Sequence, residues 1–346
     1  MITSEEYMVL DEISQIEEFP KELTLTGAPF EVGAIGVKSL TIVDSLMFFC
    51  TSNPDSPWVV SLLIDQNVLA SMLKIGQGPG EFVFAPSVSN NVTFTHFKDG
   101  LNACIFNGNQ GSILRFNIDS CLLNSQAISG TWTTDLPNTF FSTTIINDSQ
   151  AFCRELGEDH RHFERYLYDN SDGEKAQNDM MKKLDQAHVY HGDNLNILST
   201  MSKYNPELAM IVEMPIALNY INLYSLDGST GKTICMGKEL FNIREVEGMD
   251  QWDRIYTFAD LRIYSTCWGV HGLNVSEKEY QTQGSARPTL YIFNWKGEPL
   301  IKIHLQHPAS VFDFDSHTGT LYTFDVNSES FYRYSNDELT ALFTGR

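Results

Sequence analysis

The chain has 346 residues, with 44 acidic and 23 basic side chains and a formal net charge of −21. Binding to nucleic acid or to an anionic membrane surface requires clustered Lys and Arg, so this balance argues against both partners. Aromatic residues make up 12% of the chain, enough for a large core, which excludes a disordered protein. No run of about 18 apolar residues occurs, so no membrane-spanning helix is expected.

Short runs rich in Val, Ile, Phe, Tyr and Thr alternate with turns rich in Asn, Asp, Gly and Ser, a pattern typical of β-strands. A pair of such runs recurs six times, and the first runs begin at residues 46, 102, 150, 207, 261 and 321. Flanking runs extend most pairs to four strands. Repeated four-stranded antiparallel sheets that bury face against face form a β-propeller. The sequence therefore predicts one all-β domain over residues 1–346 with six blades, and seven blades is the alternative.

Two terminal runs bear on how the ring closes. Residues 339–344 are predicted as the last strand of blade 6. Residues 22–26, ELTLT, either add to blade 6 as a closing strand or lie across the edge of the ring. Closure is favoured because it ties the termini together and leaves no open sheet edge.

One segment between the first and second units is distinctive, because residues 74–82 read KIGQGPGEF. Its glycines allow positive φ values and a tight crossover, and its phenylalanine can enter the core between blades. The residues of this motif are Gly76, Gly78, Pro79, Gly80, Glu81 and Phe82. The segment lacks the Gly-Lys-Ser/Thr ending of a phosphate-binding loop, so a structural role is predicted.

This segment resembles the inter-blade loop of NHL-type repeats and, more closely, the G-x-G-P-G-E-F signature of the TolB-like six-bladed propellers that are abundant in Bacteroidetes. The blade spacing extends the resemblance over the whole chain. The resemblance implies a cell-envelope protein, in the periplasm or at the surface as a lipoprotein without its leader. The residues themselves leave a cytoplasmic location open.

Three long insertions interrupt the repeat, and such insertions often carry function in repeat proteins. Residues 174–190 have apolar side chains at helical spacing and predict a short amphipathic helix between blades 3 and 4. Residues 241–253 form an acidic connection that contains Trp252, and residues 274–287 form a polar excursion within blade 5.

The long connections of blade 5 supply the candidates for partner contact. These candidates are Trp252, Arg254, Trp268 and His271. Exposed Trp and Arg are typical anchors of interfaces, although the Trp side chains could instead pack between blades. The first hypothesis is therefore a non-enzymatic binding module, without cofactor or metal, that presents loops to a protein, a peptide or a glycan.

The second hypothesis is a metal-assisted hydrolase or lactonase with calcium in the central channel. Asp313, Asp315 and His317 alternate, so they could share one face of an inner strand of blade 6. The comparison with propeller lactonases is an analogy of fold. The alternative is that these side chains are outward polar neighbours of Phe312 and Phe314. No nucleophile elbow or HExxH motif is present.

The six cysteines are predicted to be small buried hydrophobic residues. Four of them, Cys50, Cys104, Cys153 and Cys267, lie inside apolar runs, and no CxxC pair occurs. Disulfide bonds or metal binding are the less favoured alternatives.

Overall fold

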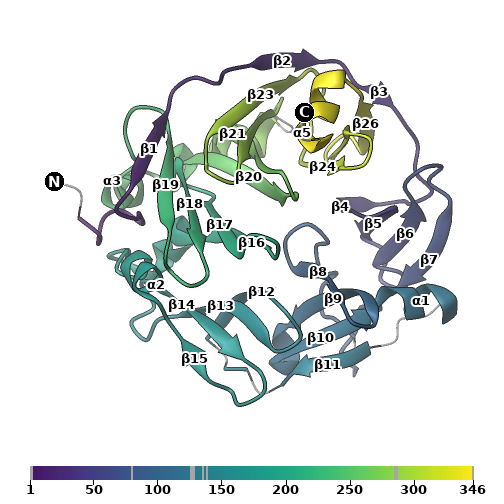
Figure 1. Ribbon diagram of the computed structural model, residues 1–346, viewed down its shortest axis with the longest axis horizontal. Helices are drawn as coiled ribbons and strands as arrows, with labels where there is room; N and C mark the ends of the chain where they lie inside the picture. Colours follow the sequence, from purple (N-terminus) through teal and green to yellow (C-terminus); the bar gives the residue numbers. More distant parts are fainter. Residues whose placement is uncertain are drawn as a thin grey trace.

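Apolar side chains occupy both faces of the strands in this chain, which decides its architecture. All six residues of β18 (Tyr220–Ser225) are buried, as are five of the six in β17 (Met210–Pro215). A sheet of such strands must be covered on both sides. In the computed structural model, which describes residues 3–78, 81–124, 129–134, 136–137, 139–283 and 287–344, six sheets stand around one axis (Figure 1). The predicted six-bladed β-propeller is confirmed.

The first three blades follow one another along the chain, each from an inner to an outer strand (Figure 1). Blade 1 consists of β4 (Val37–Val43), β5 (Leu46–Thr51), β6 (Trp58–Leu62) and β7 (Val68–Met72). Blade 2 consists of β8 (Val92–Phe97), β9 (Gly100–Asn107), β10 (Ser112–Asn117) and β11 (Ser129–Thr133). Blade 3 consists of β12 (Phe140–Ile145), β13 (Gln150–Leu156), β14 (Phe163–Asp169) and β15 (Lys175–Ala176).

The last three blades include strands from the N-terminal segment. Blade 4 consists of β16 (Thr200–Asn205), β17, β18 and β19 (Gly231–Met236), with β1 (Ile13–Ile16) outside β19. Blade 5 consists of β20 (Ile255–Ile263), β21 (Cys267–Ser276), β22 (Thr289–Asn294) and β23 (Pro299–Leu305), with β2 (Glu22–Leu25) outside β23. Blade 6 consists of β24 (Val311–Asp315), β25 (Thr320–Asp325), β26 (Ser330–Tyr334) and β3 (Ala28–Pro29).

The N-terminal segment closes the ring, but not with the residues that the sequence favoured. The prediction that residues 22–26 close blade 6 is wrong, because β2 pairs in parallel with β23 of blade 5. The shorter β3 pairs antiparallel with β26 and completes blade 6. The segment runs along the outer edges of three consecutive blades, and only its last part reaches blade 6 (Figure 1).

Short helices occupy the connections. They are η1 (Gly108–Gln110), α1 (Ile118–Asn124), α2 (Asp179–Leu184), η2 (Gly192–Leu198), α3 (Ile243–Gly248), η3 (Gln251–Asp253), α4 (Glu277–Gln283) and α5 (Asp337–Thr344). Helix α2 lies in the predicted insertion at residues 174–190, and Met181 and Leu184 are its buried residues. Among the described residues, no helix has the length and apolar character needed to cross a membrane.

The prediction of a strand at residues 339–344 is wrong, because the segment belongs to α5. Asn336 accepts a hydrogen bond from the Glu338 amide at 2.8 Å, as a residue that caps a helix N-terminus does. Leu339 is buried, and Phe343 packs against the core between blades 5 and 6. Since β3 already pairs with β26, the C-terminal segment has no free edge of blade 6 to join.

The described residues form six hydrophobic clusters, one at each boundary between neighbouring blades. Trp268 stacks on Phe293 with ring centroids 4.5 Å apart within the cluster between blades 4 and 5. Phe48 of blade 1 meets Phe94 of blade 2 at 4.6 Å. The six cysteines are free and buried, which confirms their predicted role as small core residues.

The KIGQGPGEF loop crosses from blade 1 to blade 2. Phe82 is buried in the cluster between these blades, and its amide donates to the Lys74 carbonyl at 3.0 Å. The expected positive φ is not found at Gly76 or Gly78. Instead, an added Cβ at Gly76 would lie 2.1 Å from Oε2 of Glu81, which accepts a hydrogen bond from the Gly78 amide. The Glu81 carboxylate therefore packs directly against the backbone of these two glycines; Pro79 and Gly80 lie outside the described residues.

We predict that Gly27→Ala destabilises the closed ring. An added Cβ would lie 2.7 Å from two ring carbons of Tyr334, which is buried and cannot move aside. Overpacking of this kind costs about 1–3 kcal/mol, measurable by urea unfolding. The control is Gly248→Ala, where no atom lies within 4 Å of the new Cβ. Equal losses in the two variants would contradict the packing of β3 against blade 6.

Candidate functional site

The four predicted contact residues fall into two groups. Trp252 lies in η3 and is 54% exposed. Arg254 directly follows η3 and donates a hydrogen bond to Oδ1 of Asn194 at 2.8 Å. Trp268 and His271 lie in β21 and are 0% and 1% exposed. These two cannot contact a partner at the surface, so their prediction is wrong. The reason lies in the tertiary packing, because β21 is the second strand of blade 5 and blades 4 and 6 cover its two faces.

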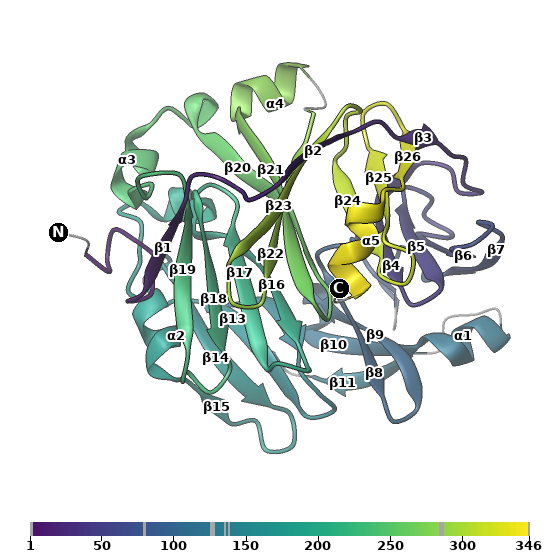
Figure 2. The same ribbon diagram turned by 45° about the horizontal axis from the view of Figure 1, so that its top comes forward.

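Trp252 belongs to a larger group of exposed apolar side chains, which we call the aromatic rim. The rim consists of Tyr190, Phe241, Met249, Trp252 and Tyr280, each at least 36% exposed. The connections that carry them are held together. Arg244 lies 3.4 Å above the ring of Tyr190, and Gln251 donates to Glu277 of α4 at 3.3 Å. Figure 2 shows α3 and α4 at the same end of the ring.

The aromatic rim has an apolar depression and acidic surroundings. A depression of about 70 Å³ is lined by apolar side chains and two polar ones: Ala217, Phe241, Val246, Met249 and Ile255, with Asn242 and Glu245. The exposed carboxylates near the rim are Asp193, Glu245, Asp250, Asp253 and Glu279. Trp and Tyr are enriched among the residues that contribute most to binding at protein interfaces, and the rim exposes both.

A second candidate site is the cavity at one end of the central channel. It has a volume of about 330 Å³ and is lined by residues of all six blades, most of them polar. Arg262 binds the Leu40 carbonyl and Thr41 of blade 1, each at 3.0 Å, and Asp260 at 3.0 Å. Asp313 accepts hydrogen bonds from Thr41 and from the Tyr264 hydroxyl, each at 2.8 Å. Blades 5, 6 and 1 therefore meet through a buried ionic cluster.

The carboxylates of the calcium hypothesis lie in different surroundings. Asp313 is committed to the ionic cluster of the channel. Asp315 accepts hydrogen bonds from the His317 amide and the Thr318 hydroxyl, within the turn that leads into β25. In the part of the chain that the structure describes, no group of three His, Cys, Asp or Glu side chains is placed to hold a metal ion. The geometry therefore offers no support for a metal-assisted hydrolase at this position.

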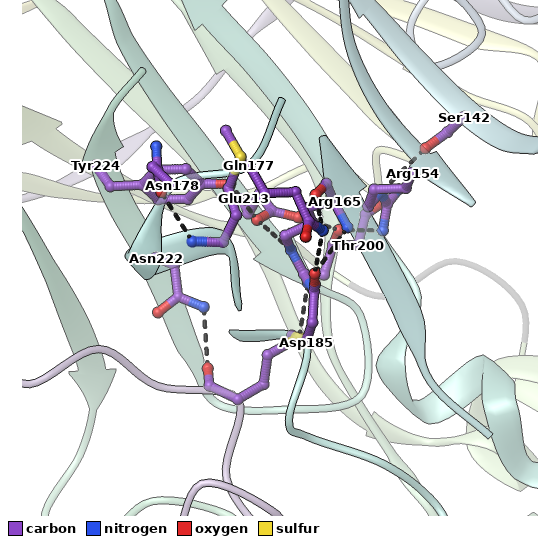
Figure 3. Close-up of polar contacts among 12 residues, drawn as sticks. Ser142, Arg154, Arg165, Gln177, Asn178, Asp185, Thr200, Glu213, Asn222 and Tyr224 are labelled. Atoms are coloured by element: carbon purple, nitrogen blue, oxygen red, sulfur yellow. Dashed lines mark hydrogen bonds and ion pairs between the residues drawn. The ribbon is translucent and has the colours of Figure 1, made fainter. Parts of the chain in front are cut away.

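A third polar group lies between blades 3 and 4 (Figure 3). Arg165 binds Glu213 at 2.8 Å and Asp185, which follows α2, at 2.7 Å. Arg154 donates to Ser142 at 3.0 Å and to Thr200 of blade 4, and burial lowers the pKa of Arg154 to about 10. Both arginines are buried, so this group holds blades together rather than meeting a ligand.

Sequence reasoning missed this inter-blade group, although a signal for it was present. Arg154 and Arg165 each stand within an apolar run, QAFCREL and FERYLYD. A charged residue within a buried strand requires a buried partner of opposite charge. The sequence alone does not show that the partner is Glu213 in the next blade, 48 residues from Arg165.

The burial of His271 predicts a pH effect on stability. Burial lowers the pKa of His271 to about 4, whereas an unfolded histidine binds a proton near pH 6.5. Between these values the unfolded chain binds more protons, so this residue's contribution to stability is lost as the pH falls. Between pH 7 and pH 4, the free energy of unfolding should fall by about 2–3 kcal/mol less in His271→Gln than in the wild type. Urea unfolding at the two pH values measures this difference. Parallel pH profiles would contradict a neutral buried imidazole.

No family model matches the chain, and no curated protein matches its sequence. Among solved structures, a member of the DUF4221 family from Bacteroides vulgatus has 11% identity and a TM-score of 0.50, over 96% of this chain and 98% of that one. TolB from Acinetobacter baumannii has 9% identity and a TM-score of 0.42, over 83% of this chain and 61% of that one. The likeness to the first structure extends over nearly the whole of both chains and concerns the fold alone.

Proposed function

We propose that the protein is a non-enzymatic interaction module that binds a basic protein or peptide through the aromatic rim. The single observation that carries the proposal is the exposure of five large apolar side chains on three connections, two of which carry α3 and α4 at the same end of the ring (Figure 2). Large apolar patches on monomeric proteins commonly mark interaction sites. The proposal needs no cofactor.

The scaffold beneath the rim is preorganised. Asp250 accepts a hydrogen bond from the Trp252 amide at 2.9 Å and fixes the start of η3. Arg254 donates to the Glu247 carbonyl of α3 at 3.2 Å, in addition to its bond with Asn194 of η2. Arg254 therefore supports Trp252 by tying the connection that contains α3 and η3 to the connection that contains η2. A rigid surface loses little conformational entropy when it binds a partner.

Charge indicates the chemistry of the partner. The carboxylates around the rim and the net charge of −21 attract basic partners and repel acidic ones. A glycan that stacks on Trp252 would bind through its apolar face and would depend little on salt. A location in the cell envelope, which the family resemblance implies, is part of the proposal.

We expect peptides selected from a random display library on the wild-type protein to combine Lys or Arg with an aromatic or aliphatic residue. Trp252→Ala should weaken their binding at least about tenfold, and high salt should weaken it further. Fluorescence anisotropy measures both effects. The matched control is Phe84→Ala, which removes an 81% exposed aromatic ring outside the rim.

Two results would contradict the proposal. One is selection of neutral peptides whose binding ignores salt. The other is equal affinity of the selected peptides for wild type and Trp252→Ala. A third outcome would indicate that the partner is a carbohydrate and not a protein. In that case the wild type binds a glycan array but no peptide, and Trp252→Ala no longer binds the array.

A further inference from the structure

The channel cavity and the aromatic rim lie at opposite ends of the ring. η3 precedes the first residue of β20, whereas Arg262, Tyr264 and Ser265 at the far end of β20 line the cavity. A nine-residue strand spans roughly 30 Å, so the two sites are well separated. A ligand in the cavity would not compete directly with a partner on the rim.

Lys203 of β16 lines the cavity and, among the described residues, forms no ion pair at contact distance. Its Nζ donates to the Ser89 carbonyl at 2.7 Å, and within the described ranges no carboxylate oxygen lies within 4.0 Å of it. Arg262, by contrast, binds two carboxylates and three further oxygens. Lys203 is partly buried and lines the cavity. A charge withdrawn from water without a partner is costly, so the site favours an anion.

Neutral polar groups elsewhere on the cavity wall complete the site. Asn90, Tyr204 and Ser265 also line the cavity, and in the described part of the chain their side chains make no hydrogen bond. Each can donate to an oxygen of a ligand. Phe94 and Ile263 add apolar wall, as in most sites for small organic molecules.

The negative charges limit the ligand to a single charge. Asp313 and Asp44 both line the cavity, and the exposed Asp44 carboxylate lies 3.0 Å from His96. One free ammonium can neutralise one negative charge, and a dianion would meet repulsion from these carboxylates. A volume of about 330 Å³ is at the small end of the range for ligand cavities.

We propose that the channel cavity binds a small organic monocarboxylate, with the Lys203 ammonium as its counter-charge and Asn90 and Tyr204 as hydrogen-bond donors. The proposal is independent of the aromatic rim. Packing alone does not explain a lysine at position 203, because a methionine of similar length would fill the same space without a charge. The proposed ligand explains why the side chain is charged.

Isothermal titration calorimetry with straight-chain monocarboxylates of two to six carbons tests the proposal. The wild type should bind at least one of them, and its neutral amide and the dicarboxylate of equal length should bind at least about tenfold more weakly. Lys203→Met should lower the affinity at least about tenfold, Lys203→Arg should retain part of it, and the surface control Lys182→Met should change nothing.

The pH dependence provides a second readout. Burial, followed by the nearby Arg262, lowers the pKa of Lys203 to about 8, against the opposing effects of Asp260 and Asp313. The cavity wall carries three other titratable groups, which are Asp44, Tyr204 and Tyr264. Carboxylate affinity should therefore fall as the pH rises above about 8, where the ammonium loses its proton.

Three results would overturn the proposal. They are equal affinity of the acid and its amide for the wild type, equal carboxylate affinity of wild type and Lys203→Met, and absence of binding by every acid at millimolar concentration. The comparison of acid with amide uses the wild-type protein alone, so it decides the matter even if a Lys203 variant fails to fold. Loss of rim binding in Trp252→Ala affects none of these outcomes.

Discussion

The constraint on which the structure depends is that every blade has two apolar faces and can leave neither in water. The hydrophobic clusters at the blade boundaries meet this requirement, because each face is covered by the next sheet. A row of sheets would leave two faces exposed at its ends, and a ring leaves none. The N-terminal segment secures the ring, since β1, β2 and β3 pair with blades 4, 5 and 6.

Buried charges act within the same framework. Arg165 joins blade 3 to Glu213 of blade 4, and Arg262 joins blade 5 to blades 6 and 1. Such pairs contribute little net stability, but a pair that is misaligned leaves a charge uncompensated and is strongly disfavoured. They therefore favour one alignment of neighbouring blades. Lys203 differs from these arginines, because among the described residues no carboxylate oxygen lies within 4.0 Å of its ammonium, and this difference is the basis of the proposed ligand site.

The blade count was predictable from sequence because each blade repeats the same alternation of apolar runs and turns. The sites were less predictable, because exposure depends on which blade covers a strand. Trp268 and Trp252 are the same residue type 16 positions apart, yet one is in the core and the other on the surface. Residues 22–26 were predictable as a strand but not as a strand of blade 5, since parallel pairing with β23 depends on contacts far apart in sequence.

Amide hydrogen exchange of the full chain tests most directly whether the N-terminal segment covers the outer edges of blades 4 and 5. The amides of Thr233, Lys302 and Gln306 donate to carbonyls of Glu12, Lys21 and Leu25, at 2.8, 2.9 and 3.1 Å. If the N-terminal segment covers these edges, the three amides should exchange as slowly as amides inside blades 4 and 5. Exchange at the rate of exposed loops, with the inner strands still protected, would contradict the account.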